Sequence, residues 1–153
     1  TRKALASGYC LWGTLLPHPS GGLKTEEAPI GVLMEATTPT DFRGSQASRI
    51  SNGAVQIVRE YTGRGPTKAR TTITDDMVTI LMGDTLTKGE QHLVDGGHEK
   101  RVLDTRQDFQ QMMRQQLVSL VETQVQRQVM AFMSTNHTNP DMAVEIFVLA
   151  PPE

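Results

Sequence analysis

A cluster of basic and glycine residues stands where a predicted helix ends and a predicted strand begins. It reads Gly63-Arg64-Gly65-Pro66-Thr67-Lys68-Ala69-Arg70. Glycines let backbone N–H groups approach a ligand closely, and an arginine fork binds an oxyanion through two hydrogen bonds. The candidate ligands for a small anion such as phosphate, a carboxylate or bicarbonate are therefore Arg64, Gly65, Thr67, Lys68 and Arg70. The same residues also suit a plain helix stop followed by a turn, so both interpretations stay open.

A second group of polar residues lies near the end of the chain. It comprises Ser134, Asn136, His137 and Asp141, all within eight residues. A histidine near a carboxylate can act as a general base, so one hypothesis is an enzyme in which His137 transfers a proton and Asp141 orients it. Asn136 is a further candidate for contacting the ligand. One histidine and one aspartate are too few to predict a metal site, and Asn-Pro-Asp is also ordinary turn chemistry.

Arg106 is the third candidate, because it falls within the apolar stripe of a predicted helix. A cation in that position must reach outward to water or meet a buried anion. Asp84, Glu145 and a bound ligand are the candidates for that anion, which adds Arg106 to the candidate ligand-binding residues. The competing interpretation is that the side chain snorkels outward or forms an internal salt bridge without any ligand.

Composition limits the function classes. The chain has 153 residues, of which 37% are hydrophobic and 21% charged, as expected for one globular domain. A net charge of -2 gives no general attraction to nucleic acid. The single cysteine, Cys10, cannot form an intramolecular disulfide, which fits the cytoplasm. No run of 18 apolar residues occurs, so a membrane role would need a partner protein.

The chain divides near residue 44. Residues 1–44 contain short apolar bursts broken by prolines and glycines, which predicts a disordered or irregular leader. From Ser45 the periodicity predicts a helix ending at Gly63, a hairpin with strands starting near Lys68 and Val78, and a short helix opened by a capping box at Thr87. A longer helix follows the Gly96-Gly97 break. Two last strands, Val129 to Ser134 and Met142 to Leu149, are expected on either side of a loop over residues 135–141.

This order of elements predicts an α+β fold. We expect a four-stranded, mainly antiparallel sheet built from two hairpins, with the helices packed on one face. The last strand is apolar on one side, with Val144, Ile146 and Val148, and mostly apolar on the other, with Ala143, Phe147 and Leu149 and with Glu145 as the exception. A strand that is apolar on both sides is usually covered on both, so the second face of the sheet predicts a homodimer.

Four segments carry a resemblance to a known family. They are Ile50-Ser51-Asn52-Gly53, Arg59-Glu60-Tyr61 followed by Gly63-Arg64-Gly65-Pro66-Thr67-Lys68-Ala69, Ser134 with Asn136-His137 and Asp141, and Val144-Glu145-Ile146-Phe147-Val148-Leu149. Together they resemble the MpsC-type domain, which is named after a Na⁺-translocating, membrane-potential-generating system. The resemblance covers residues 45–153 and leaves residues 1–44 unexplained. It implies a small soluble domain associated with ion or inorganic-carbon uptake machinery, with no cofactor and no known catalytic mechanism.

Three hypotheses for function stay open. The first, favoured by the resemblance, is an accessory or regulatory domain in the cytoplasm. It would join a membrane transport complex through a partner and sense a small anion through Arg64, Lys68 and Arg106. The second is a small enzyme acting on an anionic substrate, which requires the basic loop and His137 to meet in one cleft. The third is a purely structural dimer.

Overall fold

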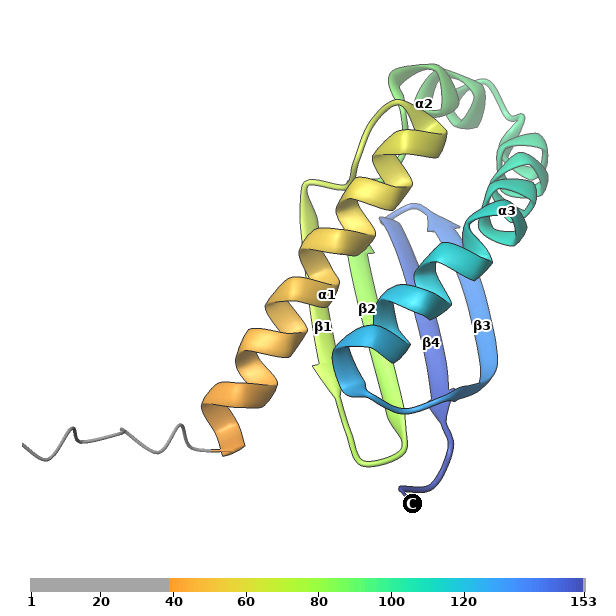
Figure 1. Ribbon diagram of the computed structural model, residues 1–153. Coiled ribbons are helices and arrows are strands. Elements are labelled where there is room, and N and C mark those ends of the chain that lie inside the picture. Colours follow the sequence, from red (N-terminus) through yellow and green to blue (C-terminus); the bar gives the residue numbers. More distant parts are fainter. Residues whose placement is uncertain (1–38, 153) are drawn as a thin grey trace, which may run out of the picture. The chain divides into compact units, whose positions relative to one another are not determined.

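The computed structural model describes residues 39–152, which form three helices and four strands (Figure 1). In chain order the elements are α1 (Pro39–Thr62), β1 (Lys68–Ile73), β2 (Met77–Gly83), α2 (Lys88–Asp95), α3 (Glu99–Val125), β3 (Val129–Thr138) and β4 (Asp141–Leu149). The first helix begins at Pro39, so residues 39–44 are helical, although the sequence analysis placed them in the leader. The rest of the predicted leader, residues 1–38, lies outside the described residues.

The four strands form one antiparallel sheet in the order β1-β2-β4-β3. The first and last hairpins lie side by side because β2 pairs with β4 in the middle of the sheet. Helices α1 and α3 both lie over the same face, and α2 sits beyond the end of the sheet (Figure 1). The predicted α+β fold, with two hairpins and helices on one face, is therefore confirmed.

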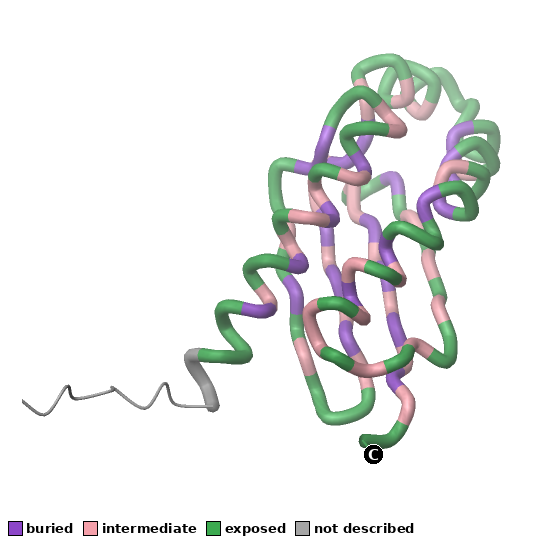
Figure 2. Tube along the Cα trace, viewed as in Figure 1, coloured by how far each residue is buried: buried purple, intermediate pink, exposed green. Residues whose placement is uncertain are grey.

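The hydrophobic core lies between the two long helices and the sheet. Every second residue of β2 and β4 is buried there, as the alternating colours of the central strands show (Figure 2). The largest inward side chain of β4, Phe147, is fully buried and packs beside Phe132 of β3, with ring centroids 5.1 Å apart. Burial of each such side chain stabilises the fold by about 1.5–3 kcal/mol. This core fixes which face of each strand points away from the helices.

Local signals set the helix boundaries. The first helix stops where Gly63 adopts a positive φ of 76°, with its N–H donating to the Arg59 carbonyl at 2.9 Å. Thr87 and Glu90 form the predicted capping box that starts α2. Gly53 lets α1 and α3 approach closely, because a Cβ at this position would lie 2.7 Å from the Cδ1 of Leu120. The two glycines permit a positive φ and a close helix contact because they lack a Cβ, and the Thr87 and Glu90 side chains cap the helix start by hydrogen bonding.

The expected loop over residues 135–141 is wrong. Strand β3 continues to Thr138 and β4 already begins at Asp141, so only Asn139 and Pro140 form the turn, with a cis peptide bond between them. Pairing across the hairpin, such as Asn136 opposite Ala143, holds these polar residues in the strand. On an edge strand, polar side chains can alternate between the two faces, and this alternation concealed the strand in the sequence.

Within residues 39–152, no helix combines the length and the apolar character that a membrane crossing requires.

Candidate functional site

The predicted anion-binding corner already contains acceptors from the chain itself. Thr67 donates to Oδ2 of Asp84 at 2.5 Å, and Nζ of Lys68 lies 3.2 Å from the same oxygen. The hydrogen bonds from Thr67 and Lys68 lower the pKa of Asp84 below its ordinary value. Arg64 donates to the backbone carbonyl of Leu86. The corner thus closes the junction between α1, β1 and the end of β2.

The two other members of the corner have separate environments. Gly65 is buried, and a Cβ there would lie 3.0 Å from the carbonyl oxygen of Val55, so close packing against α1 explains this glycine. Arg70 is exposed on β1, and no ion pair involves it among the described residues. Binding of an external anion by Arg64, Gly65, Thr67, Lys68 or Arg70 stays a prediction.

The proposed catalytic pair is not brought together. Nδ1 of His137 is 2.8 Å from the Pro140 carbonyl, and the ring is exposed. The Asp141 carboxylate instead accepts hydrogen bonds from Thr85 Oγ1 at 2.7 Å and from the Leu86 N–H at 2.8 Å. Because Asp141 is occupied by the loop after β2, it does not orient His137. General acid–base catalysis by this pair therefore has no geometric support.

Arg106 forms the densest polar cluster in the described part of the chain. The residue is 5% exposed, and its Nε and Nη2 atoms lie 2.9 and 3.1 Å from the two carboxylate oxygens of Glu90. The same guanidinium donates to the Thr85 carbonyl at 2.6 Å, to Thr85 Oγ1 at 3.0 Å and to Asn136 Oδ1 at 3.4 Å. Neither Asp84 nor Glu145 supplies the anion, and the internal salt bridge that was the competing interpretation forms instead. The partner is Glu90, because α2 places its first turn beside the N-terminal part of α3.

Glu90 was recognised in the sequence only as part of a capping box. Burial alone would raise its pKa, but hydrogen bonds from Arg106 and from Thr87 outweigh burial and hold the pKa below its ordinary value. Thr85 links the cluster to Asp141, so the structure brings Arg106, Asn136 and Asp141 close to one another. The bonds of this cluster are made within the chain, and they clamp α2, α3 and the loop after β2 onto β3.

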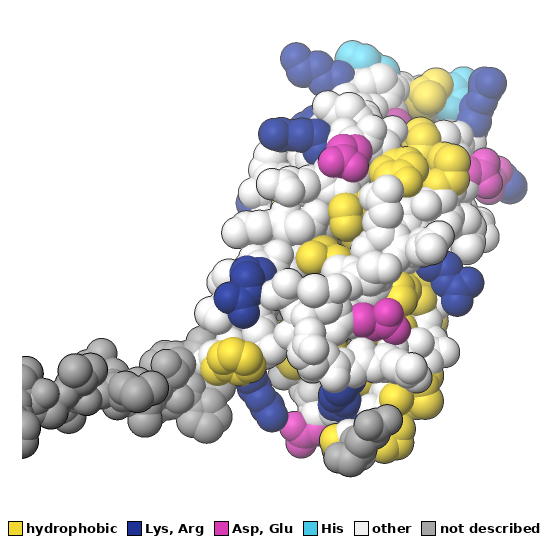
Figure 3. Space-filling model, in the orientation of Figure 1, with side chains coloured by type: hydrophobic (Ala, Val, Ile, Leu, Met, Phe, Trp, Pro, Cys, Tyr) yellow, Lys and Arg dark blue, Asp and Glu magenta, His cyan; other side chains and the backbone are white. Residues whose placement is uncertain are grey.

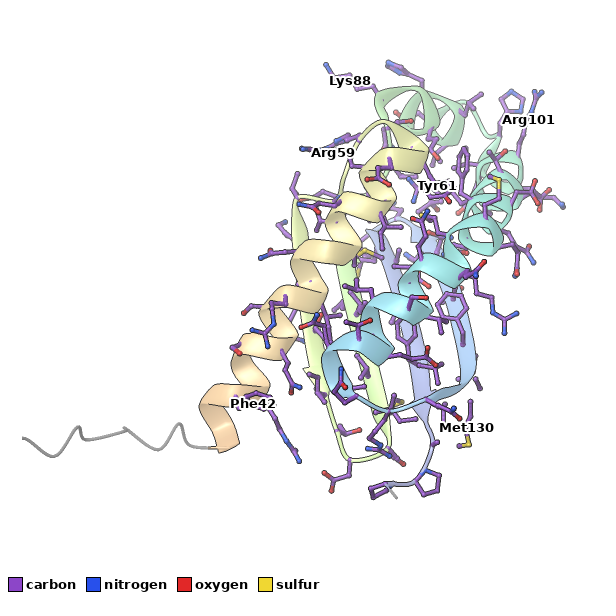
Figure 4. All side chains as sticks on the ribbon, in the orientation of Figure 1. Phe42, Arg59, Tyr61, Lys88, Arg101 and Met130 are labelled. Carbon is purple, nitrogen blue, oxygen red and sulfur yellow. The ribbon has the colours of Figure 1, made fainter. Side chains whose placement is uncertain are left out.

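Other basic residues of the helices, including Arg59, Lys88 and Arg101, are exposed and point outward (Figure 4).

The sheet face opposite the helices, called the open face below, consists of the outward residues of all four strands. They are Lys68, Arg70 and Thr72 of β1, Met77, Thr79 and Leu81 of β2, Met142, Val144, Ile146 and Val148 of β4, and Ala131, Met133, Thr135 and His137 of β3. All four outward residues of β4 are apolar and only half-buried. The open face therefore has an apolar centre and two cations at its β1 margin, of which Lys68 is paired with Asp84 from the loop after β2.

A shallow depression crosses the open face between its basic margin and His137. Two adjoining hollows of about 430 and 210 Å³ share Leu81 and Met142 as lining residues. The first reaches Lys68 and Arg70, and the second reaches His137. Lys68 and His137 stand in one row of the sheet, three strand spacings apart, which is about 14 Å. Groups at that separation cannot act on one reacting atom, but they can bind different parts of one extended partner.

The helix-covered side has a different character. Hydrophobic side chains emerge there between α1 and α3, and lysines and arginines lie around the margin (Figure 3). A groove of about 730 Å³ runs between these helices, and its apolar part is contributed by Ile57, Tyr61, Met112 and Leu120. Its remaining wall consists mainly of polar side chains, namely Glu60, Gln115, Gln116, Ser119, Thr123 and Gln124. The open face is therefore the more apolar of the two surfaces.

Glu145, a candidate partner of Arg106 in the sequence, instead occupies a site of its own in the core. This residue points into the core from β4, opposite Ser134 of β3, and is 1% exposed. Burial raises its pKa to about 7, although Ser134 and Gln110 act in the opposite direction. The available signal was a single acidic residue in an otherwise apolar strand.

Comparison with known proteins gives one result. A family model described as Na⁺-translocating membrane potential-generating system (MpsC) matches residues 43–151. No curated protein and no solved structure matches the chain. The matched segment starts inside α1 and includes every strand and the other two helices. The chain belongs to the MpsC family, as the resemblance of its sequence motifs predicted.

Proposed function

We propose that this protein is an accessory component of a Na⁺-translocating membrane system and that it binds its partner protein through the open face of its sheet. The family description supports the association with such a system. The observation that carries the binding mode is the apolar centre of the sheet, which no other element of residues 39–152 covers. An antiparallel sheet with one face on the core normally presents polar residues on the other face. Here the outward residues of β4 are all apolar.

The apolar open face suits a protein interface. Contiguous exposed apolar surface is uncommon on monomeric proteins, and it marks sites of association. At the β3 edge Met133 is 50% exposed, so the apolar surface extends beyond the central strands. Methionine is flexible and polarisable, and it adapts to the shape of a partner. Burial of this surface would supply the favourable term for docking.

Charge defines what kind of segment the open face accepts. Lys68 and Arg70 stand at its β1 margin, and none of its outward strand residues is acidic. Asp84 already pairs with Lys68, so Arg70 is the cation of this margin that has no ion-pair partner among the described residues. A second copy of the chain would bring the same cations and no acidic strand residue to this interface. A segment with apolar side chains and an acidic residue beside them complements both features. We therefore assign the open face to an acidic, apolar segment of the membrane-embedded component, and self-association becomes the competing outcome.

The geometry favours binding over catalysis. The Asp141 carboxylate accepts hydrogen bonds from Thr85 and Leu86, so it is not available to His137. Lys68 and His137 lie on opposite edge strands of the sheet, too far apart to act on one substrate atom. A bound anion is not required by the proposed function, because Asp84 already accepts from Thr67 and Lys68.

Site-specific photo-cross-linking tests the proposal. A photoreactive amino acid replaces Met133 on the open face or, as the matched control, Met112 on α3, since these methionines are 50% and 54% exposed. Cross-linking is carried out in membranes that contain the Na⁺-translocating system, and mass spectrometry identifies the adducts. We expect Met133 to capture an integral membrane subunit of that system and Met112 to capture none. Capture of only a second copy from Met133, or equal capture from both positions, would refute the proposal.

A further inference from the structure

Within residues 39–152, a carboxyl group is enclosed in the core without a cation beside it. Glu145 lies in the central strand β4 between Ile80 of β2 and Ser134 of β3, on the face that α1 and α3 cover. Burying an ionised carboxylate without a counterion is strongly unfavourable, so such groups hold a proton instead. Whether Glu145 has a counterion depends on the side chains that face it from the neighbouring strands and helices.

The elements around Glu145 provide no counterion. The inward residues of β2 are Val78, Ile80 and Met82, those of α1 are Ile50, Ala54 and Val58, and those of β3 beside Glu145 are Phe132, Ser134 and Asn136. None of these side chains is charged. The buried side chains of α3 include one cation, Arg106, whose guanidinium is occupied by Glu90, Thr85 and Asn136. Among the described residues, Glu145 thus has no ion-pair partner.

Two oxygens at this position lack hydrogen-bond partners. They are Oε2 of Glu145 and Oγ of Ser134, which stand opposite each other on paired strands. The other carboxyl oxygen, Oε1, has a single long contact of 3.5 Å from Nε2 of Gln110. A proton on Oε2 makes it a donor, and Ser134 Oγ is the acceptor directly across the hairpin. The neutral acid therefore suits this site better than the carboxylate does.

A cavity offers water a route to the same place. It lies between α3 and β3, has a volume of about 360 Å³, and is lined by Gln110 and Ser134, the two residues that face Glu145. Gln107, Gln111 and Asn136 contribute further amides to its wall. Since a water molecule occupies about 30 Å³ of liquid, the cavity has room for several waters beside Gln110 and Ser134.

We propose that Glu145 is a proton-binding switch within the fold, which keeps the joint between α3 and β3 closed when protonated and admits water from the cavity when it loses its proton. Hydration of the carboxylate requires Gln110 or Ser134 to move, because both stand between it and the cavity. The part of α3 that loosens is residues 103–111, which border the cavity. The switch does not depend on the docking role of the open face, which lies on the other side of the sheet.

Linkage between protonation and folding gives the first test. The pKa of Glu145 is raised from 4.5 to about 7, so the folded protein keeps a proton that the unfolded chain loses between these values. Stability therefore falls as pH rises through this window and levels off above it. Glu145→Gln is a neutral mimic of the protonated acid. The ratio of the unfolding equilibrium constant of wild type to that of Glu145→Gln should therefore rise about tenfold per pH unit between pH 5 and 7. Exposed histidines are common to both proteins, so this comparison removes their contribution.

Urea unfolding at pH 5, 6, 7 and 8 provides these constants, with Glu60→Gln on the exposed surface of α1 as the matched control. Hydrogen exchange of residues 103–111, corrected for intrinsic rates, should show more frequent opening at pH 8 than at pH 6 in wild type and in Glu60→Gln. It should show no such difference in Glu145→Gln. Identical profiles in wild type and Glu145→Gln would overturn the proposal.

A spectroscopic titration of the unaltered chain covers the case in which Glu145→Gln fails to fold. The infrared band of a protonated carboxyl group should persist in the folded wild type up to about pH 7. Disappearance of every such band below about pH 5, where exposed acids ionise, would show that Glu145 does not hold a proton and would equally overturn the proposal.

Discussion

Arg106 of α3 donates hydrogen bonds to both carboxylate oxygens of Glu90 of α2, at 2.9 and 3.1 Å. The two side chains are only 6% and 14% exposed. The two helices are consecutive in the chain, and the glycines at positions 96 and 97 turn it between them. The pair therefore fixes the angle at which α2 returns over the start of α3. Through Thr85 and Asn136 it also ties both helices to the sheet.

Breaking this pair from one side should destabilise the fold strongly. Arg106→Gln leaves Glu90 without its main partner, and Glu90→Gln leaves a buried guanidinium, so each should lower the free energy of unfolding by about 3–5 kcal/mol. The double variant should lose less than the sum of the two. Urea unfolding measures all three. Lys100→Ala, which removes the exposed pair with Asp104, should change stability by less than about 1 kcal/mol. A small effect of Arg106→Gln would contradict the clamp.

The same pair predicts a dependence on acid. Because the pKa of Glu90 is lowered on folding, its contribution to stability is present above the ordinary value of 4.5 and is lost as pH falls through the folded value. Wild type should therefore lose stability below about pH 4.5 more steeply than Glu90→Gln does. Thermal unfolding at pH 3 to 6 checks this. Parallel curves for the two proteins would show that Glu90 ionisation is not linked to folding.

Asp84 should prevent Lys68 and Thr67 from binding an external anion. Millimolar bicarbonate or phosphate should therefore change the Tm of wild type and of Lys68→Ala by the same amount. In Asp84→Asn the carboxylate charge is gone, so any affinity of the corner for anions should appear there first. A thermal-shift titration compares the three proteins. A bicarbonate shift in wild type that disappears in Lys68→Ala would instead establish the corner as an anion site.

Two glycines of α1 should respond in opposite directions to alanine. Gly53→Ala places its Cβ 2.7 Å from Leu120 Cδ1 and should cost about 1–3 kcal/mol, relieved in part by Leu120→Ala. Gly44 has no atom within 4 Å of a new Cβ, so Gly44→Ala should stabilise the helix by up to about 1 kcal/mol. Chemical denaturation gives both values. Equal effects at the two positions would contradict the close contact between α1 and α3.

Periodic and capping signals predicted the fold because they are local. The capping box at Thr87, the stop at Gly63 and the alternation in β2 each depend on residues a few positions apart, and the structure has all three. The long strand β3 was cut short in the prediction because its polar second half resembles a loop. Its pairing with β4, not its composition, makes it a strand.

The candidate sites were harder to predict because they depend on contacts between distant residues. Arg106 was recognised from its place in an apolar stripe, but its partner Glu90 could be found only after α2 was placed over α3. Likewise Asp84 reaches Thr67 and Lys68 only because β1 and β2 pair. A sequence shows that a cation needs a partner, and the packing of the elements decides which one it meets.

The affinity of the purified chain for membranes containing the Na⁺-translocating system tests the central claim most directly. Val144→Asp puts a carboxylate in the apolar centre of the open face, and Gln116→Asp puts one on the exposed side of α3. Co-sedimentation should show at least about tenfold weaker binding for Val144→Asp, equivalent to about 1.4 kcal/mol, and wild-type binding for Gln116→Asp, with both variants folded by circular dichroism. Wild-type affinity in Val144→Asp, or loss of binding in Gln116→Asp, would contradict docking through the open face.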